Sequence, residues 1–214
     1  MRCILASLLF LSFFVKAQDP ERFADEVSAI QKKYDTLFDA SKETIVFTGS
    51  SSVRIWNDLQ ERFPEHQIVN SGFGGSQASD LLAYTEELIL QYSPQKIFIY
   101  EGDNDIAEGK DAKQIMNDLL AIMAKIRTQN PSAEIILIAA KPSIARWNLK
   151  KNYKRLNRKF KKLSRKDAEL HYADVWKPMV VKGSVMTDIF IEDGLHMNSK
   201  GYEIWFNTLK PFLE

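Results

Sequence analysis

Four short polar segments of the 214-residue sequence carry side chains that together could perform acyl transfer. The first holds Ser51 among three consecutive serines, and the second is the glycine-rich stretch 70–76. The third holds Asn104, and the fourth places Asp193 three residues before His196. A serine whose proton passes to a histidine steadied by a carboxylate is an acyl-transfer nucleophile. Glycine-rich backbone and an asparagine amide can hold the oxyanion that such an attack creates.

Each segment taken alone has a simpler interpretation. Serine is a common helix N-cap, and a glycine-rich stretch is often a plain turn. Asp103 and Asp105 beside Asn104 are compatible with a metal site, but two carboxylates without further ligand spacing are thin evidence for one. A dinucleotide-binding loop would need G-x-G-x-x-G after the first strand. The nucleophile elbow G-x-S-x-G is not matched, because Val53 stands where its second glycine belongs.

The elements around these segments form a regular alternation of apolar runs and amphipathic stretches. The apolar runs predict strands at 44–48, 67–70, 96–100, 134–140 and 169–173, and the stretches between them predict helices near 22–38, 78–91, 111–129, 147–166 and 199–212. This alternation favours a parallel sheet with helices on both faces, where ligands bind beyond the carboxyl ends of the strands. The polar segments fall at these ends, which favours a single shared site.

In this order along the chain, the four segments resemble the sequence blocks of the SGNH, or GDSL-type, hydrolase superfamily. The resemblance covers about residues 44–212. It implies an α/β fold, a three-layer α/β/α sandwich with a five-stranded parallel sheet of the flavodoxin-like kind.

The resemblance also implies roles for individual residues. The GDS block aligns with Gly49-Ser50-Ser51, the G-x-N-D block with residues 102–105 and the D-x-x-H block with residues 193–196. The implied triad is Ser51, Asp193 and His196, and the implied oxyanion hole is formed by Ser51, Gly75 and Asn104. The chemistry implied needs no metal and no organic cofactor.

Two positions depart from the family pattern. Ser50 stands in place of the first-block aspartate, and Ser76 in place of the aspartate that often follows the oxyanion glycine. Neither position belongs to the triad, so we expect activity to be retained. Because Ser50, Ser51 and Ser52 are consecutive, only the alignment with the family block selects Ser51 as the nucleophile.

The expected function is hydrolysis of carboxylic esters, with an acylated or acetylated carbohydrate or a lysophospholipid-like ester as substrate. The alternative is a non-catalytic carbohydrate- or lipid-binding protein on the same scaffold. A formal net charge of +1 gives no field that would demand nucleic acid as a partner. The sequence leaves the oligomeric state open.

The N-terminus has the features of a secretory signal peptide. Met1-Arg2 precedes the apolar run 3–15, and Val15-Lys16-Ala17 supplies the small residues of a cleavage site. We therefore expect a signal peptide over residues 1–17 and a hydrolase domain over residues 18–214, exported to the periplasm or secreted. A bilayer span needs about 20 apolar residues, so stable membrane insertion is not expected.

Two further features bear on the protein's environment and surface. The only cysteine, Cys3, lies in the predicted signal peptide, so the mature protein would have neither disulfides nor thiolate chemistry. Residues 146–166 carry eleven Lys or Arg residues around one apolar helix face. Such a basic surface either holds anionic lipid or polysaccharide or is simply solvated. Arg146 and Trp147 follow a predicted strand and are expected at the site entrance.

Overall fold

The computed structural model describes residues 19–214, so the predicted signal peptide lies outside the described residues. A five-stranded parallel sheet in the order β2-β1-β3-β4-β5 forms its centre, which confirms the predicted fold class. Its strands are β1 (Thr44–Gly49), β2 (Gln67–Gly72), β3 (Lys96–Tyr100), β4 (Glu134–Ile138) and β5 (Leu170–Ala173).

Apolar side chains on both faces of the sheet explain why the strands read as unbroken hydrophobic runs. In β1, Ile45 and Phe47 point into one core and Val46 between them points into the other. The ring of Phe47 stacks on that of Phe98 in β3 at 4.2 Å between centroids. The sheet thus separates two hydrophobic cores, each of which needs a layer of helices to cover it.

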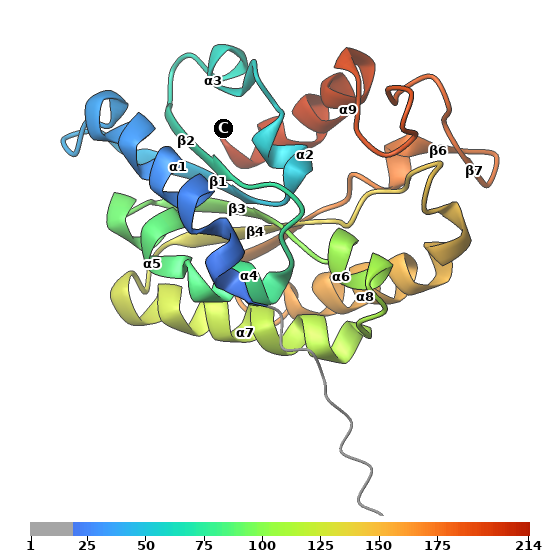
Figure 1. Cartoon of the computed structure of the whole chain (residues 1–214), viewed down its shortest axis with the longest axis horizontal. Helices are drawn as coiled ribbons and strands as arrows, with labels where there is room; N and C mark the ends of the chain where they lie inside the picture. The colour runs from blue at the N-terminus through green and yellow to red at the C-terminus, as the bar shows by residue number, and fades with distance from the viewer. Residues whose placement is uncertain (1–18) are drawn as a thin grey trace, which may run out of the picture.

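Helices cover the two faces in unequal numbers (Figure 1). One layer consists of α2 (Ser51–Arg54), α3 (Leu59–Arg62) and α9 (Ser199–Leu209). The other consists of α1 (Ala24–Leu37), α4 (Ala78–Ala83), α5 (Thr85–Leu88), α7 (Ala112–Gln129) and α8 (Lys150–Leu163). The layers make the three-layer α/β/α sandwich that was expected.

The stretch 78–91, predicted as one helix, is three short pieces: α4, α5 and a 3₁₀ turn at Leu90–Tyr92. The break has a local cause. The Thr85 hydroxyl donates to the carbonyls of Leu81 and Leu82, which competes with the helical backbone at the junction. By contrast, α7 is continuous, and Asp111 caps it in a reciprocal capping box with Gln114.

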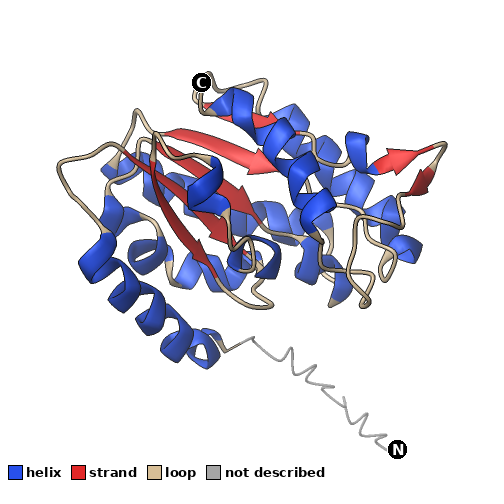
Figure 2. Cartoon of the chain, turned by 90° about the horizontal axis from the view of Figure 1, so that it is seen from above, coloured by secondary structure: helices blue, strands red, loops and turns tan. Residues whose placement is uncertain are grey.

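Several short elements were not predicted, among them the helices α2, α3 and α6 (Asp103–Ala107). The helices α2 and α6 directly follow β1 and β3 at the carboxyl edge of the sheet, and α3 lies between α2 and β2. A hairpin of β6 (Val180–Val181) and β7 (Ser184–Val185) stands apart from the main sheet (Figure 2). Lys182 and Gly183 form its two-residue turn with φ values of 48° and 82°. None of the helices within residues 19–214 is long and apolar enough to cross a bilayer.

Candidate active site

Ser51 occupies the first position of α2, directly beyond the end of β1. The turn between them depends on Gly49, whose φ is 114°. A Cβ atom at this position would lie 2.1 Å from the carbonyl oxygen of Tyr100, so only glycine fits between β1 and β3 here. The close contact between β1 and β3 therefore determines the turn that leads from β1 to Ser51.

Ser51, His196 and Asp193 form one hydrogen-bonded chain. Ser51 Oγ lies 2.9 Å from His196 Nε2, and His196 Nδ1 lies 2.5 Å from Asp193 Oδ2. The second carboxylate oxygen, Asp193 Oδ1, accepts the backbone N–H groups of Leu195 (2.8 Å) and His196 (2.9 Å). The carboxylate thus braces both the imidazole ring and the turn that carries it, and a histidine held in this way can accept a proton from the serine hydroxyl.

The Asp193 carboxylate is strongly biased toward its charged form. Partial desolvation opposes ionisation, but hydrogen bonds from the His196 ring and from the N–H groups of Leu195 and His196 outweigh it. Together they lower the pKa of Asp193 to about 2. The side chain facing His196 Nδ1 is therefore an anion at every ordinary pH.

Asn104 reaches the same site from α6. Its amide nitrogen donates to Ser50 Oγ (2.6 Å) and to the carbonyl of Ser76 (2.9 Å). Gly102, with φ of 103°, supplies the left-handed turn that leads into α6. The amide is thereby anchored between the serine segment and the glycine-rich segment, beside the residue that precedes Ser51.

Gly75 lies in the exposed turn between β2 and α4, with φ of 71° and open space where a side chain would be. The preceding residue is pinned, because Gly74 N–H donates to both carboxylate oxygens of Glu26 at 3.0 and 3.1 Å. The following residue, Ser76, accepts the Asn104 amide. Gly75 therefore sits between two anchored residues, within one residue of a direct contact to Asn104.

The two serines that replace family aspartates are both buried and hydrogen-bonded. Ser50 accepts from Asn104, and the Ser76 hydroxyl donates to Glu101 Oε1 at 2.7 Å. Glu101 is itself buried, and desolvation together with the negative charge of Asp105 raises its pKa well above the usual range. Burial therefore favours the neutral form of the carboxyl that lies behind the glycine-rich segment.

Asp103 and Asp105, considered above as metal ligands, have separate partners. Asp105 accepts the N–H of Ala78 and pairs with Lys110 at 3.3 Å. Asp103 instead meets the guanidinium of Arg146. Among residues 19–214, no group of three or more His, Cys, Asp or Glu side chains is placed to hold a metal ion.

Lys141 and Tyr153, which both contact Asp103, were not predicted as site residues; Tyr153 was expected only on the apolar face of the helix within 146–166. Lys141 follows β4 and its side chain is completely buried, while Tyr153 lies on the covered face of α8. Arg146 was expected near the entrance, and its guanidinium donates to Asn104 Oδ1 at 3.0 Å. Trp147 is turned aside and stacks on Trp176 at 5.9 Å.

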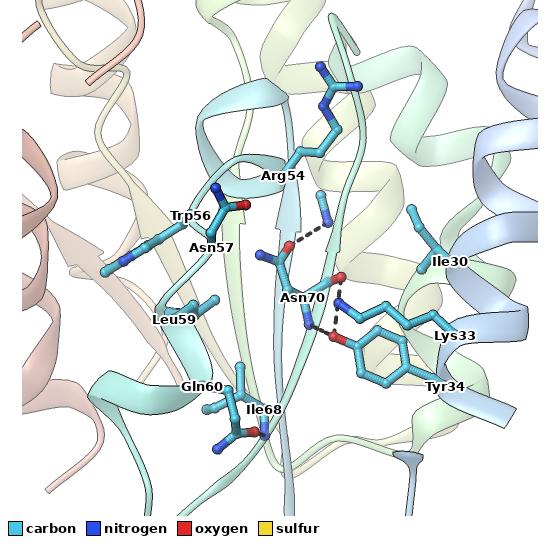
Figure 3. Close-up of a pocket in the computed structure, with 11 residues that line it drawn as sticks. Ile30, Lys33, Tyr34, Arg54, Trp56, Asn57, Leu59, Gln60, Ile68 and Asn70 are labelled. Carbon is cyan, nitrogen blue, oxygen red and sulfur yellow. Dashed lines mark hydrogen bonds between the residues drawn. The ribbon is translucent and has the colours of Figure 1, made fainter. Parts of the chain in front are cut away.

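A pocket of about 210 Å³ lies between α1, the segment from α2 to α3, and β2 (Figure 3). Arg54 and Asn70 line it, together with Tyr34, whose hydroxyl accepts the Asn70 N–H at 2.7 Å. None of the residues of the expected triad and oxyanion hole (Ser51, Gly75, Asn104, Asp193 and His196) lines this pocket. It is therefore separate from the Ser51–His196 pair.

Comparison with known proteins bears on both the family and the fold. The sequence model of the GDSL-like Lipase/Acylhydrolase family matches residues 39–204. A comparison with curated proteins gave no significant match.

Solved structures with the same fold come from bacteria and a fungus. A Streptococcus pneumonia protein provisionally named platelet activating factor is 26% identical with a TM-score of 0.78, covering 91% of this chain and 95% of its own. A GDSL-like lipase from Bacteroides thetaiotaomicron VPI-5482 is 19% identical with a TM-score of 0.72, covering 91% and 97%. A carbohydrate esterase family 3 protein from Talaromyces cellulolyticus is 17% identical with a TM-score of 0.63, covering 80% and 96%.

Proposed function

The chain belongs to the GDSL-like lipase/acylhydrolase family and is a hydrolase of ester bonds, and from this premise we propose that it works through a Ser51–His196–Asp193 triad. The observation that carries the proposal is the 2.9 Å contact between Ser51 Oγ and His196 Nε2, two atoms 145 residues apart in sequence. A contact of this length is the one a nucleophile needs with its general base. The carboxylate on the other ring nitrogen supports the same assignment.

The reaction would proceed in two balanced halves. Ser51 Oγ attacks the ester carbonyl while its proton moves to His196 Nε2, and the imidazolium then protonates the departing alcohol. Water attacks the resulting acyl-serine, gives one proton to His196 and releases the acid, and that proton returns to Ser51. Asp193 stays ionised throughout and steadies the imidazolium.

The oxyanion would be received by the backbone N–H groups of Ser51 and Gly75 and by the Asn104 amide. Ser51 N–H lies at the start of α2, and the glycine has no side chain to obstruct approach. The incoming oxygen competes with the Ser50 hydroxyl for one Asn104 N–H. Loss of a single oxyanion donor costs about 10²–10³ in turnover, so Asn104→Ala should lower kcat by that factor.

For the substrate we propose an acylated or acetylated carbohydrate, or a lysophospholipid-like ester. The family, and the carbohydrate esterase among the similar folds, support this choice. We also propose that residues 1–17 are a signal peptide and that the hydrolase acts after export. A comparison of acetylated sugars with short- and long-chain esters would identify the alcohol and acyl groups.

A serine substitution series tests the proposed nucleophile. Ser51→Ala should lower kcat/KM for a soluble short-chain ester by about 10⁴-fold or more, because the attacking oxygen is gone. Ser52→Ala is the matched control, because the contact of Ser52 with Tyr202 is made by the backbone carbonyl, which alanine keeps. An inactive Ser52 variant beside an active Ser51 variant would move the nucleophile by one residue.

Covalent labelling separates the enzyme from a non-catalytic binding protein. A fluorophosphonate probe reacts only with an activated serine, so the wild-type protein should be labelled at residue 51 and Ser51→Ala should not. Failure of the wild-type protein to react would favour the non-catalytic alternative.

A further inference from the structure

We propose that Arg146 and Lys141, which meet at the buried carboxylate of Asp103, are positioning residues that hold the two halves of the active site in register. Arg146 orients and polarises the Asn104 amide, and Lys141 holds the loop that carries His196. The inference rests on the proposed function, because it assigns the oxyanion donor to Asn104 and the general base to His196.

The Asp103 carboxylate is the centre of this arrangement, and it is only 4% exposed. Tyr100 donates to it at 2.8 Å and Arg146 at 2.6 Å, Tyr153 donates a short hydrogen bond, and the Lys141 ammonium lies 3.6 Å away. Desolvation opposes ionisation, but the charges of Lys141 and Arg146 outweigh it and lower the pKa of Asp103. Asp103 is thus a buried anion whose partners are fixed in place.

Arg146 links this anion to Asn104. One guanidinium nitrogen donates to Asp103 and the other donates to Asn104 Oδ1 at 3.0 Å. A cation at the amide oxygen draws electron density from nitrogen to oxygen and makes the amide N–H groups stronger donors. The same contact fixes which end of the amide faces Ser50 and Ser76. Arg146 therefore acts on the proposed oxyanion donor, the Asn104 amide, through the amide oxygen.

Lys141 links the same anion to the histidine loop. Its ammonium donates to the carbonyl of Leu195, the residue before His196, at 2.7 Å. Burial lowers the pKa of Lys141, and the charge of Asp103 opposes that shift. The segment that follows β4 makes a second contact with the loop, from Ala145 N–H to the carbonyl of Gly194 at 3.0 Å. The loop is thus fixed at the two residues that precede the imidazole.

A direct role of Arg146 in binding an anionic substrate is the competing explanation. Its guanidinium side chain is 20% exposed, and both terminal nitrogens are engaged by protein groups. An arginine held in this way has little freedom to follow a ligand. We therefore assign its effect to Asn104 and test the assignment by coupling.

A double-mutant cycle between Arg146 and Asn104 measures that coupling. Arg146→Lys keeps a positive charge near Asp103 but cannot bridge Asp103 and Asn104 at once. We expect it to lower kcat about 10-fold to 100-fold with KM changed less than about 3-fold, as an interaction made only in the transition state would. In the Asn104→Ala background the same change should cost less than about 3-fold. Arg155→Lys, on the exposed face of α8, is the control and should change nothing.

An oxyanion mimic provides a readout that general loosening of the fold would not reproduce. A trifluoromethyl ketone forms a hemiketal with the serine whose oxygen occupies the oxyanion hole, so its Ki should rise in Arg146→Lys by the factor that kcat/KM falls. Equal losses in both backgrounds of the cycle, or an unchanged Ki, would overturn the role of Arg146. Neither result would alter the outcome of the Ser51→Ala test, so the two proposals fail separately.

The Lys141 contact is tested by proton NMR. The proton between His196 Nδ1 and Asp193 should give a low-field resonance in the wild-type protein and in Arg155→Lys. In Lys141→Met, which keeps the volume but removes the ammonium, the resonance should broaden or shift, and labelling by fluorophosphonate should slow. A folded Lys141→Met protein with an unchanged resonance and labelling rate would contradict the role assigned to Lys141. If this variant does not fold, the double-mutant cycle between Arg146 and Asn104 still tests the contacts around Asp103.

Discussion

Ser50 and Ser76 are the two serines at the positions where the family resemblance leads one to expect aspartate. Ser50 accepts the Asn104 amide, and Ser76 donates to a buried carboxyl, Glu101. Burial raises the pKa of Glu101, which favours its neutral form one hydrogen bond behind the glycine-rich segment. The two serines therefore brace Asn104 and the glycine-rich segment through hydroxyl groups, while a charged group, the Arg146 guanidinium, contacts the Asn104 amide.

The pH dependence of hydrolysis should report a single proton on the acid side. Asp193, with a pKa of about 2, is ionised throughout the range above about pH 4, so it contributes no step there. His196 must be neutral to accept the proton of Ser51, so kcat/KM should rise with pH through one ionisation. Asp193→Asn should lower kcat by about 10⁴-fold, because the ring loses its preferred tautomer.

The measurement is kcat/KM against pH on a soluble neutral ester, with Ser52→Ala as the reference variant. A profile that stays flat to about pH 4 in a fully active enzyme would remove His196 from the mechanism, and two acid-side ionisations would contradict the single proton expected here.

Glu101 should make the protein less stable as the pH rises. Because its pKa in the folded protein is raised, the folded chain holds a proton that the unfolded chain releases above about pH 4.3. The folded state is therefore disfavoured progressively with increasing pH up to the folded pKa. Glu101→Gln keeps an acceptor for Ser76 and removes the titration, so it should raise Tm by several degrees at pH 8 and by little at pH 4.

Thermal unfolding at the two pH values, with wild-type protein alongside, measures this difference. An equal change in Tm at both pH values would show that the buried acid is not the cause.

At the scale of elements, the site depends on how closely β1 and β3 approach each other. Gly49 lies against the backbone of Tyr100, and the two strands deliver α2 and α6 side by side at the sheet edge. Ser51 and Asn104 come from these two helices. Their spacing is therefore set by strand pairing rather than by the loops themselves.

Gly49→Ala should unfold or severely destabilise the protein, because a Cβ atom at 2.1 Å from a backbone oxygen cannot be accommodated by rotating a side chain. Gly183→Ala is the matched control. It also has a positive φ, at 82°, but nothing lies within 4 Å of its added Cβ, so it should cost only about 1 kcal/mol. Chemical denaturation of both variants isolates the clash, and similar losses would argue against it.

The parts of the fold that could be predicted are those that depend on residues close together in the sequence. The five strands were recognised as short apolar runs, and their bounds agree with the predicted ones to within two residues. The break at Thr85 depends on side-chain hydroxyl contacts that compete with an otherwise helical pattern. The short helices α2 and α6 are too brief to show any periodicity.

The site residues likewise fall into those that a local motif indicates and those that only the folded structure brings together. Ser51, Asn104 and the pair Asp193–His196 were found through short motifs, which record the residue types that the chemistry needs. Lys141 was not found, because its neighbours in sequence say nothing of Asp103 and Leu195, 38 and 54 residues away. Supporting contacts of this kind exist only once the sheet has formed.

At the scale of the whole molecule, the boundary at residue 17 remains a prediction. Protein purified from an exporting host should begin at or near Gln18, because Val15-Lys16-Ala17 fits a cleavage site. Intact-mass measurement and N-terminal sequencing of the exported fraction would show this. An exported protein that retains Met1 would contradict the assignment, and an Ala17→Leu variant should accumulate uncleaved.

The helix α1 makes its side-chain hydrogen bonds with residues far from it in the sequence. Its side chains bond to residues 28 to 60 positions later, from Glu26 with Arg54 to Gln31 with Gln91, and Tyr34 closes the open edge of β2 through Asn70. A chain threaded through a pore from its N-terminus delivers α1 long before those partners arrive. Under the proposed export, α1 would emerge before the residues that it contacts and could dock only after they arrive. Its docking would then cover the edge of β2, an unpaired strand edge that could otherwise pair with another chain.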